Sequence, residues 1–146
     1  MSSTADIVRQ LLVDLGVGVD STTADWSVFV NREPDTPDQA ITVYDTAGIT
    51  EGRLQVSGEV PEQHSFQVRV RSSHYPDGYD KIEAIATALD QTVYGNTITL
   101  TEEYGTGTQD FTIHAATKRG TVIPLGVDES NSSRYLFTVN YTITFD

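Results

Sequence analysis

The chain has 146 residues, no cysteine, and a formal net charge of −12 from 21 acidic and 9 basic side chains. This length suits one hydrophobic core, so we expect a single domain over residues 1–146, and the lack of cysteine excludes disulfides, thiolate metal sites and cysteine nucleophiles. The acidity argues against a grip on nucleic acid or on an anionic membrane, which both attract basic surfaces, and no apolar run approaches a membrane span.

The first element predicted from the sequence is a helix. Ile7, Leu11 and Leu15 recur at every fourth position and form one apolar stripe, which is the pattern of an amphipathic helix. Thr4 is a suitable N-cap residue, because its hydroxyl can accept a hydrogen bond from the first turn. Gly16 is suited to end the helix.

Two short strands and two loops are predicted next. Residues 26–30 and 40–45 carry the apolar and β-branched side chains typical of strands. Residues 31–38 contain two prolines and are predicted to form a loop. Residues from about 46 to 64 contain three glycines and a proline, and we expect a long exposed loop or a flexible hairpin there.

A strictly alternating strand and a second helix follow. The expected strand covers residues 66–71, with Phe66, Val68 and Val70 directed at a core and Gln67, Arg69 and Arg71 directed outward. After a break at Tyr75 to Gly78, a helix is expected over about residues 78–92. Its buried stripe consists of Ile82, Ile85, Ala86 and Leu89.

The remainder of the chain is predicted to be β-structure. Ile98 and Leu100 alternate with threonines, and Phe111, Ile113 and Ala115 alternate with polar residues, with a turn between the two strands. The strongest strand signal covers residues 135–145, where aromatic and apolar side chains occupy every odd position. We expect this strand in the middle of the sheet, with its aromatic face covered by the helices.

These elements add up to two helices and about six or seven strands, and the strands come mostly in runs. This order favours an α+β fold, a mostly antiparallel β-sheet with two helices packed on one face. We find no internal repeat and no domain boundary.

No catalytic or metal-binding constellation is apparent, and we expect neither enzymatic activity nor a cofactor. The three histidines, His64, His74 and His114, lack metal-site spacing, and His74 with Asp77 would supply only half a metal site. The segment Gly105 to Thr108 lacks the Gly-Lys-Ser/Thr ending of a phosphate loop and is better explained as a hairpin turn.

Arg69 and Arg71 are the most suggestive charged residues. Alternation places two positive charges on one outward sheet face of an acidic protein. Such a face could contact an acidic neighbour, including another copy of this chain, or it could simply keep the surface soluble. We therefore treat Arg69 and Arg71 as a candidate subunit interface.

Two parts of the sequence resemble the tail terminator or minor capsid family of long-tailed bacteriophages. The strand at residues 66–71 leads through Tyr75 into a helix over residues 81–89, as in that family's "QVRVR" segment. Residues 124–128 and 134–141 resemble its "LG.D..GR..F..N" closing strand. Ser133 departs from this pattern, because it stands where the family has glycine before the arginine.

The resemblance implies a ring, usually a hexamer, that caps the finished tail tube, stops its polymerisation and joins the tail to the head. The implied partners are further copies of the chain, the tail tube protein and a head–tail connector protein. DNA would pass through the ring without specific binding, and no membrane is involved. The implied location is the head-proximal end of the virion tail, after assembly in the host cytoplasm.

Two other functions remain open. A head-completion or neck connector protein would have the same sequence features and would differ in its binding partner. A cytosolic small-ligand or carbohydrate-binding module is a candidate from another class, because Trp26 and the tyrosines could stack on sugars. Clustering of these aromatic residues in an exposed groove would favour this second alternative.

Overall fold

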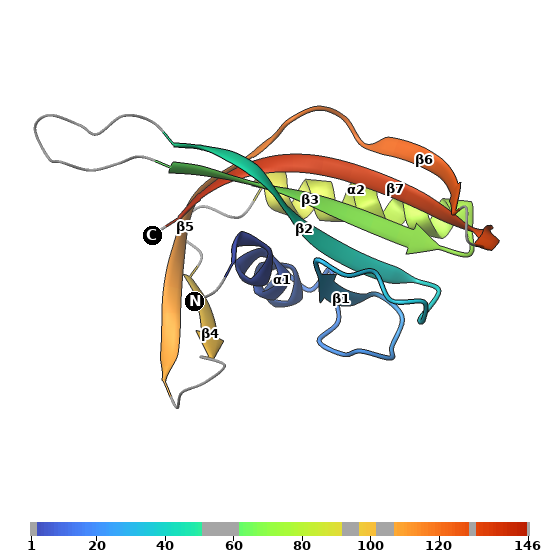
Figure 1. The fold of residues 1–146 in the computed structure, drawn as a ribbon, viewed down its shortest axis with the longest axis horizontal. Helices are drawn as coiled ribbons and strands as arrows, with labels where there is room; N and C mark the ends of the chain where they lie inside the picture. Colours follow the sequence, from blue (N-terminus) through green and yellow to red (C-terminus); the bar gives the residue numbers. More distant parts are fainter. Residues whose placement is uncertain (1–2, 51–61, 92–96, 102–106, 129–130, 146) are drawn as a thin grey trace, which may run out of the picture.

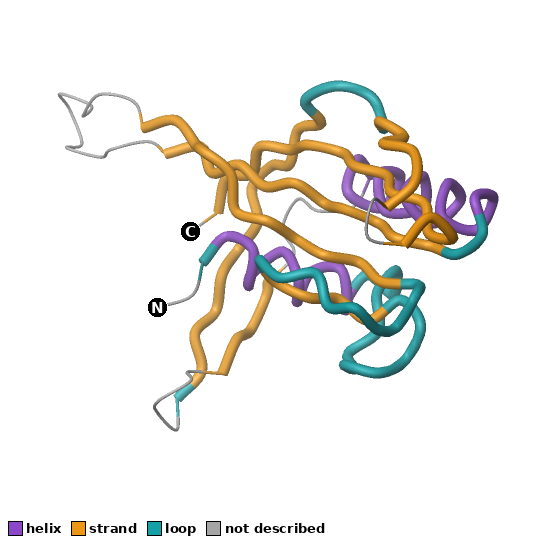
Figure 2. The backbone as a smooth tube through the Cα atoms, turned by 45° about the vertical axis from the view of Figure 1, so that its right-hand side comes forward, coloured by secondary structure: helices purple, strands orange, loops and turns teal. Residues whose placement is uncertain are grey.

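The computed structural model describes residues 3–50, 62–91, 97–101, 107–128 and 131–145 (Figures 1 and 2). Within them the fold is α+β, as predicted. The helices are α1 (Thr4–Asp14) and α2 (Tyr75–Gln91). The strands are β1 (Ser27–Val30), β2 (Ala40–Thr50), β3 (Glu62–Ser72), β4 (Thr97–Thr101), β5 (Thr108–Lys118), β6 (Ile123–Asp128) and β7 (Asn131–Phe145).

The strands form one seven-stranded sheet in the order β1-β2-β3-β7-β5-β4. All pairs are antiparallel except β1 with β2, which is parallel. The last strand, β7, lies in the middle of the sheet, as the sequence predicts. Strands β5 and β6 share one edge of β7: β5 pairs with its C-terminal part and β6 with its N-terminal part.

Both helices cover the same face of the sheet. Helix α2 packs on β3, β5 and β7, whereas α1 packs on β1, β2 and β3 and also reaches β4. The β4–β5 pair turns away from the β2, β3 and β7 strands, so the sheet curls around α1 (Figure 2). The predicted stripes of α1, β3, α2 and β7 meet in one buried core, centred on fully buried residues such as Leu11, Phe66, Ile85, Phe137 and Tyr141.

Helix α1 begins one residue earlier than predicted. Its N-cap is Ser3 rather than Thr4: the Ser3 hydroxyl accepts a hydrogen bond from the Asp6 amide, and the Asp6 carboxylate accepts one from the Ser3 amide. This reciprocal pair satisfies two amides that would otherwise lack a partner. The end of the helix is as predicted, with Gly16 at φ +80°, a conformation that glycine adopts without a steric penalty.

The start of α2 was predicted too late, at about residue 78. The helix begins at Tyr75 because Pro76 falls in the first turn, where a missing amide hydrogen costs nothing. Gly78 is required by close packing rather than by a turn. A Cβ at this position would come within 2.6 Å of Cε2 of Phe137 and 3.0 Å of the Ser72 Cβ. The glycine therefore lets α2 lie directly on β7.

Two details of the strands differ from the simplest expectation. Of the loop and the hairpin expected around residues 46–64, the hairpin fits the described ends, because residues 46–50 and 62–64 extend β2 and β3 and Thr50 pairs with Glu62; residues 51–61 lie outside the described part of the chain. Ala115 does not share the buried face of Phe111 and Ile113, because a bulge after Ile113 shifts the register. Ala115 is exposed, and Ala116 packs on the core instead.

Candidate interaction surfaces

The polar residues of the central strands lie on the outer face of the sheet, which is the face opposite the helices. Even-numbered residues of β7 lie beside odd-numbered residues of β3 on this face. Gln67 and Asn140 are one such pair, and the Gln67 side-chain amide donates to Oδ1 of Asn140 over 3.2 Å. The loop between β1 and β2 covers one end of this face, and no other part of the described chain covers the opposite end, which we call the open end.

Arg71 lies beneath that covering loop. Only 2% of the residue is exposed, so the expectation that it would be a surface residue is wrong. Its guanidinium donates to the carbonyl oxygen of Pro37 over 2.6 Å and to that of Asp38 over 3.3 Å. Arg71 points to the outer face, as the alternation predicts, but the loop folds over it and turns it into a buried anchor.

Arg134 is a second buried anchor for the same loop. It is 2% exposed, and its Nη1 donates to the Asp35 carbonyl over 2.7 Å. Its guanidinium also lies 3.3 Å from the Asp35 carboxylate and 3.7 Å from that of Asp38. The sequence analysis assigned no role to Arg134. The alternation of β7 nevertheless places it on the outer face, and the acidic residues of the loop are visible in the sequence.

Arg69 differs from these two arginines because its side chain reaches the surface, with 30% exposed. It lies 3.6 Å from the Glu33 carboxylate and 5.3 Å from the centre of the Tyr44 ring. Burial, followed by the charge of Glu33, raises the pKa of Tyr44. The structure thus brings Arg69 and Arg71 to one face, where both bind the loop and Arg69 also meets solvent.

The open end of the outer face contains a polar pocket of about 320 Å³. Thr46, Ser65, Arg119, Asn140 and Tyr141 line it. The Arg119 amide donates to the Asn140 carbonyl over 2.8 Å, which continues the β5–β7 ladder and places the Arg119 side chain on the outer face beside Asn140. Ser65 is only 5% exposed, and its hydroxyl has no hydrogen-bond partner among the described residues.

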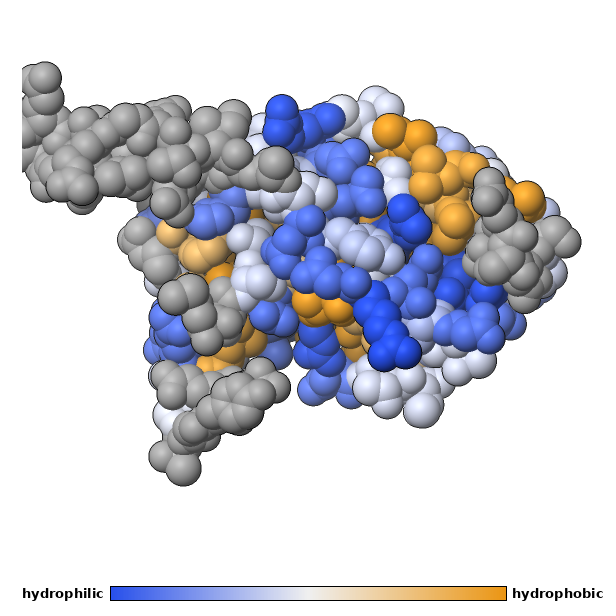
Figure 3. Space-filling view, in the orientation of Figure 1, coloured by the Kyte–Doolittle hydropathy of each residue, from blue (hydrophilic) through white to orange (hydrophobic). Residues whose placement is uncertain are grey.

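Strand β6 carries an exposed apolar row that the sequence analysis did not single out. Ile123, Leu125 and Val127 are 47%, 47% and 48% exposed. Hydrophobic atoms gather at this place on the surface (Figure 3). Within the described residues β6 pairs only with β7, so the edge of β6 that faces away from β7 is an unpaired sheet edge.

The described residues contain no group of three or more side chains suited to hold a metal ion. His64 stacks on Phe145 with ring centres 4.7 Å apart, while His74 and His114 are exposed. Two residues of the hairpin turn predicted at Gly105 to Thr108, Gly105 and Thr106, lie outside the described residues. Thr101 and Thr108 pair at the ends of β4 and β5.

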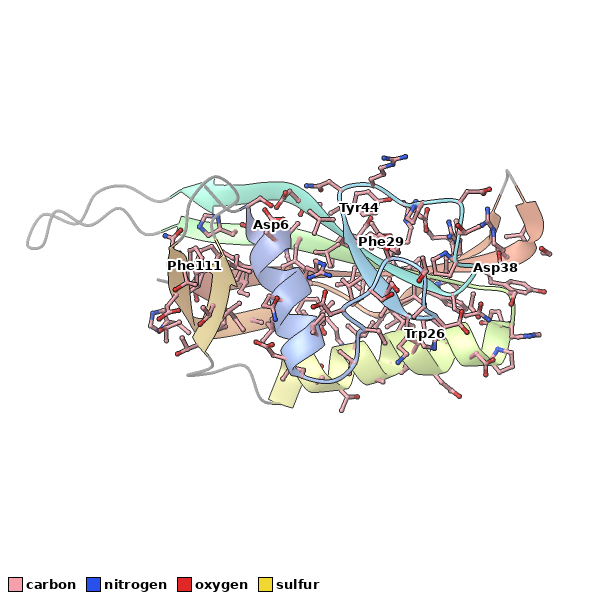
Figure 4. The ribbon with its side chains drawn as sticks, turned by 90° about the horizontal axis from the view of Figure 1, so that it is seen from below. Asp6, Trp26, Phe29, Asp38, Tyr44 and Phe111 are labelled. Atoms are coloured by element: carbon pink, nitrogen blue, oxygen red, sulfur yellow. The ribbon has the colours of Figure 1, made fainter. Side chains whose placement is uncertain are left out.

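The aromatic residues divide between several places. Trp26 is partly buried over α2 (Figure 4), where the Lys81 ammonium lies 5.1 Å from the centre of its ring. Burial lowers the pKa of Lys81. Trp26 and Lys81 also line a shallow cleft of about 350 Å³. Tyr75 and Tyr79 are exposed at the start of α2, whereas Tyr141 is fully buried.

We expect Tyr141 to make stability fall at high pH. Its hydroxyl lies 3.3 Å from both the Ala86 carbonyl and the Asp90 carboxylate. Burial, followed by the charge of Asp90, raises its pKa above the ordinary 10.0. A raised pKa in the folded state gives stability that is present below about pH 10 and is lost as the pH rises further, because the unfolded chain ionises first.

The test compares the native chain with Tyr141→Phe by urea unfolding between pH 7 and pH 11. At pH 7 the variant should lose about 1 kcal/mol, the usual value of a hydrogen bond. Above pH 10 its stability should fall less steeply than that of the native chain. Equal slopes would show that Tyr141 is not held in its neutral form. Tyr44 and Lys81 are present in both chains, so their titrations cancel in the comparison.

Comparison with known proteins adds one match. A family model described as bacteriophage tail terminator protein matches residues 11–146. This span includes every strand, helix α2 and the C-terminal part of α1. No curated protein matches the sequence. No helix in the described part of the chain is long and apolar enough to cross a membrane.

Proposed function

The chain belongs to the bacteriophage tail terminator family, and on this premise we propose that it forms a homo-oligomeric ring, a hexamer, on the end of the tail tube. The ring ends polymerisation of the tube and provides the surface to which the head is joined. Its partners are further copies of the chain, the tail tube protein and a head–tail connector protein. The observation that carries this proposal is the family match over residues 11–146.

The charge of the chain supports a position on the path of the DNA. A net charge of −12 offers few cations to displace the counterions of a phosphate backbone. Two of the arginines, Arg71 and Arg134, are also buried, and the partly exposed Arg69 lies beside the Glu33 carboxylate. A ring of such subunits repels DNA and lets it pass without holding it. The protein then sits at the head-proximal end of the virion tail, after assembly in the host cytoplasm.

The direct test is to determine the mass of the purified protein by light scattering after size exclusion, with negative-stain imaging of the main peak. Rings alone, or rings that appear when purified tail tubes are added, support the proposal. A protein that stays monomeric and ignores tail tubes contradicts it. If the protein binds only the connector, a neck connector becomes the better assignment.

We further propose that the surface around Arg69 contacts the neighbouring subunit. The buried Arg71 holds the loop between β1 and β2 in place beside this surface. In a ring, each subunit contacts its two neighbours through two different surfaces. The surface around Arg69 on one subunit must therefore meet a different, acidic surface on the next. Arg69→Glu should weaken assembly at least about tenfold, since a charge-assisted contact becomes a repulsive one.

The control for Arg69→Glu is the exchanged pair, Arg69→Glu with Glu33→Arg. This double variant restores the ion pair within the subunit, so its melting temperature should return towards that of the native chain. If the role of Arg69 is at the interface, assembly stays weak in the double variant. Recovery of assembly together with stability would show that Arg69 serves only its own fold.

A further inference from the structure

The open end of the outer face repeats the arrangement found at its covered end. At the covered end, arginines of β3 and β7 bind an acidic loop: Arg69 lies beside Glu33, and Arg134 lies beside Asp35 and Asp38. At the open end, Arg119 occupies the same face next to β7. Within the described residues, no carboxylate pairs with the Arg119 guanidinium.

The pocket beside Arg119 is built to receive a polar group. Ser65 is nine-tenths buried and its hydroxyl is unpartnered among the described residues, which costs free energy unless a further group binds it. The Asn140 side chain borders the same pocket and is held in place by Gln67. Thr46 closes the third side. One cation, two hydroxyls and an amide are a suitable set for a carboxylate.

We propose that this pocket receives an Asp or Glu carboxylate from a second copy of this chain. Each copy brings 21 acidic side chains against 9 basic ones, so a neighbour presents many carboxylates and few competing cations. A phosphate of passing DNA is disfavoured by the same net charge of −12. The contact joins the outer face of one subunit to an acidic surface of the next, as a closed ring requires. This inference rests on the ring proposed above.

The test is Arg119→Gln, with Arg32→Gln as the matched control. Arg32 is an exposed arginine of the covering loop and does not line the pocket. Both variants remove one positive charge, and neither touches the core. Under the conditions in which the native chain assembles, Arg119→Gln should weaken assembly at least about tenfold with an unchanged melting temperature, because a charge-assisted hydrogen bond is lost. Arg32→Gln should assemble as the native chain does.

A second variant tests the pocket itself. Ser65→Asp places a carboxylate within it, and this internal group should compete with that of the neighbour and weaken assembly, whereas Ser65→Ala should assemble normally or slightly less well. Normal assembly of both Arg119→Gln and Ser65→Asp would overturn the inference and leave the ring proposal intact. A native chain that never assembles would instead contradict the ring proposal.

Binding of a fluorescent duplex DNA tests whether the pocket receives a DNA phosphate instead of a carboxylate from a second copy of the chain. The native chain should bind this duplex no better than Arg119→Gln does. If the native chain binds it and the variant does not, the pocket holds a phosphate, and the carboxylate inference is overturned.

Discussion

Replacing Arg71 with methionine should lower the free energy of unfolding by about 3 kcal/mol, because a buried guanidinium that donates to two carbonyls would be lost. Methionine retains much of the apolar volume, so the change removes chiefly the polar contacts of the guanidinium, which include the hydrogen bonds to Pro37 and Asp38. The Pro37 and Asp38 carbonyls would then lose these donors where the loop covers the outer face of the sheet. We expect the loop between β1 and β2 to detach before the remainder unfolds.

Urea unfolding followed by the fluorescence of Trp26, the only tryptophan, measures this loss. Trp26 is a suitable probe because its amide donates to the Gln39 carbonyl at the end of the loop. Limited proteolysis should cut the variant within residues 31–39 faster than the native chain. The control is Lys118→Met. Its ion pair with Asp90 is 3.6 Å long and more than a third exposed on each side, so its loss should cost less than about 1 kcal/mol. Similar losses for both variants would contradict the anchoring role of Arg71.

The second large effect is expected at Phe137, where alanine should cost about 3–5 kcal/mol. Phe137 is fully buried on the central strand, and its ring lies against Gly78 of α2. Gly78→Ala in the native chain should cost about 1–3 kcal/mol, because the new methyl group would overlap the phenyl ring.

The two changes should not be additive. In Phe137→Ala the space beside Gly78 is vacated, so the added methyl group of Gly78→Ala fills part of the cavity. We expect the double variant to be more stable than the sum of the single losses by about 1 kcal/mol or more. Phe66→Ala combined with Gly78→Ala is the control and should be additive. The three heavy atoms nearest to a Cβ at position 78 belong to Phe137 and Ser72, and none belongs to Phe66. Additivity in both cycles would contradict the close approach of α2 to β7.

Much of the core could be predicted because it depends on local periodicity. The alternation in residues 135–145 was sufficient to identify a central strand, and the stripe of Ile82, Ile85 and Leu89 gave the buried side of α2. The resemblance to the tail terminator family includes these same segments, and the family match covers them. These features are visible in the sequence because burial of one face of a helix or strand places apolar residues at regular intervals along the chain.

The features that were missed depend on distant parts of the chain. Arg71 was expected to be exposed because alternation gives the face of a residue but not what covers that face, and its cover comes from the loop 34 residues earlier. Strand β6 was not recognised because Pro124 and Gly126 interrupt it and its apolar residues face solvent. The bulge that exposes Ala115 leaves no signal in the alternation itself.

The central position of β7 also has a consequence for the order of folding on the ribosome. Strands β1 to β3 form one half of the sheet and β4 with β5 forms the other, and β7 is the strand that joins them. Both halves are synthesised before β7 emerges, so each must wait with an unpaired edge and a partly uncovered core. A nascent chain stalled before residue 131 should be held by chaperones, and completion of β7 is the step that closes the sheet.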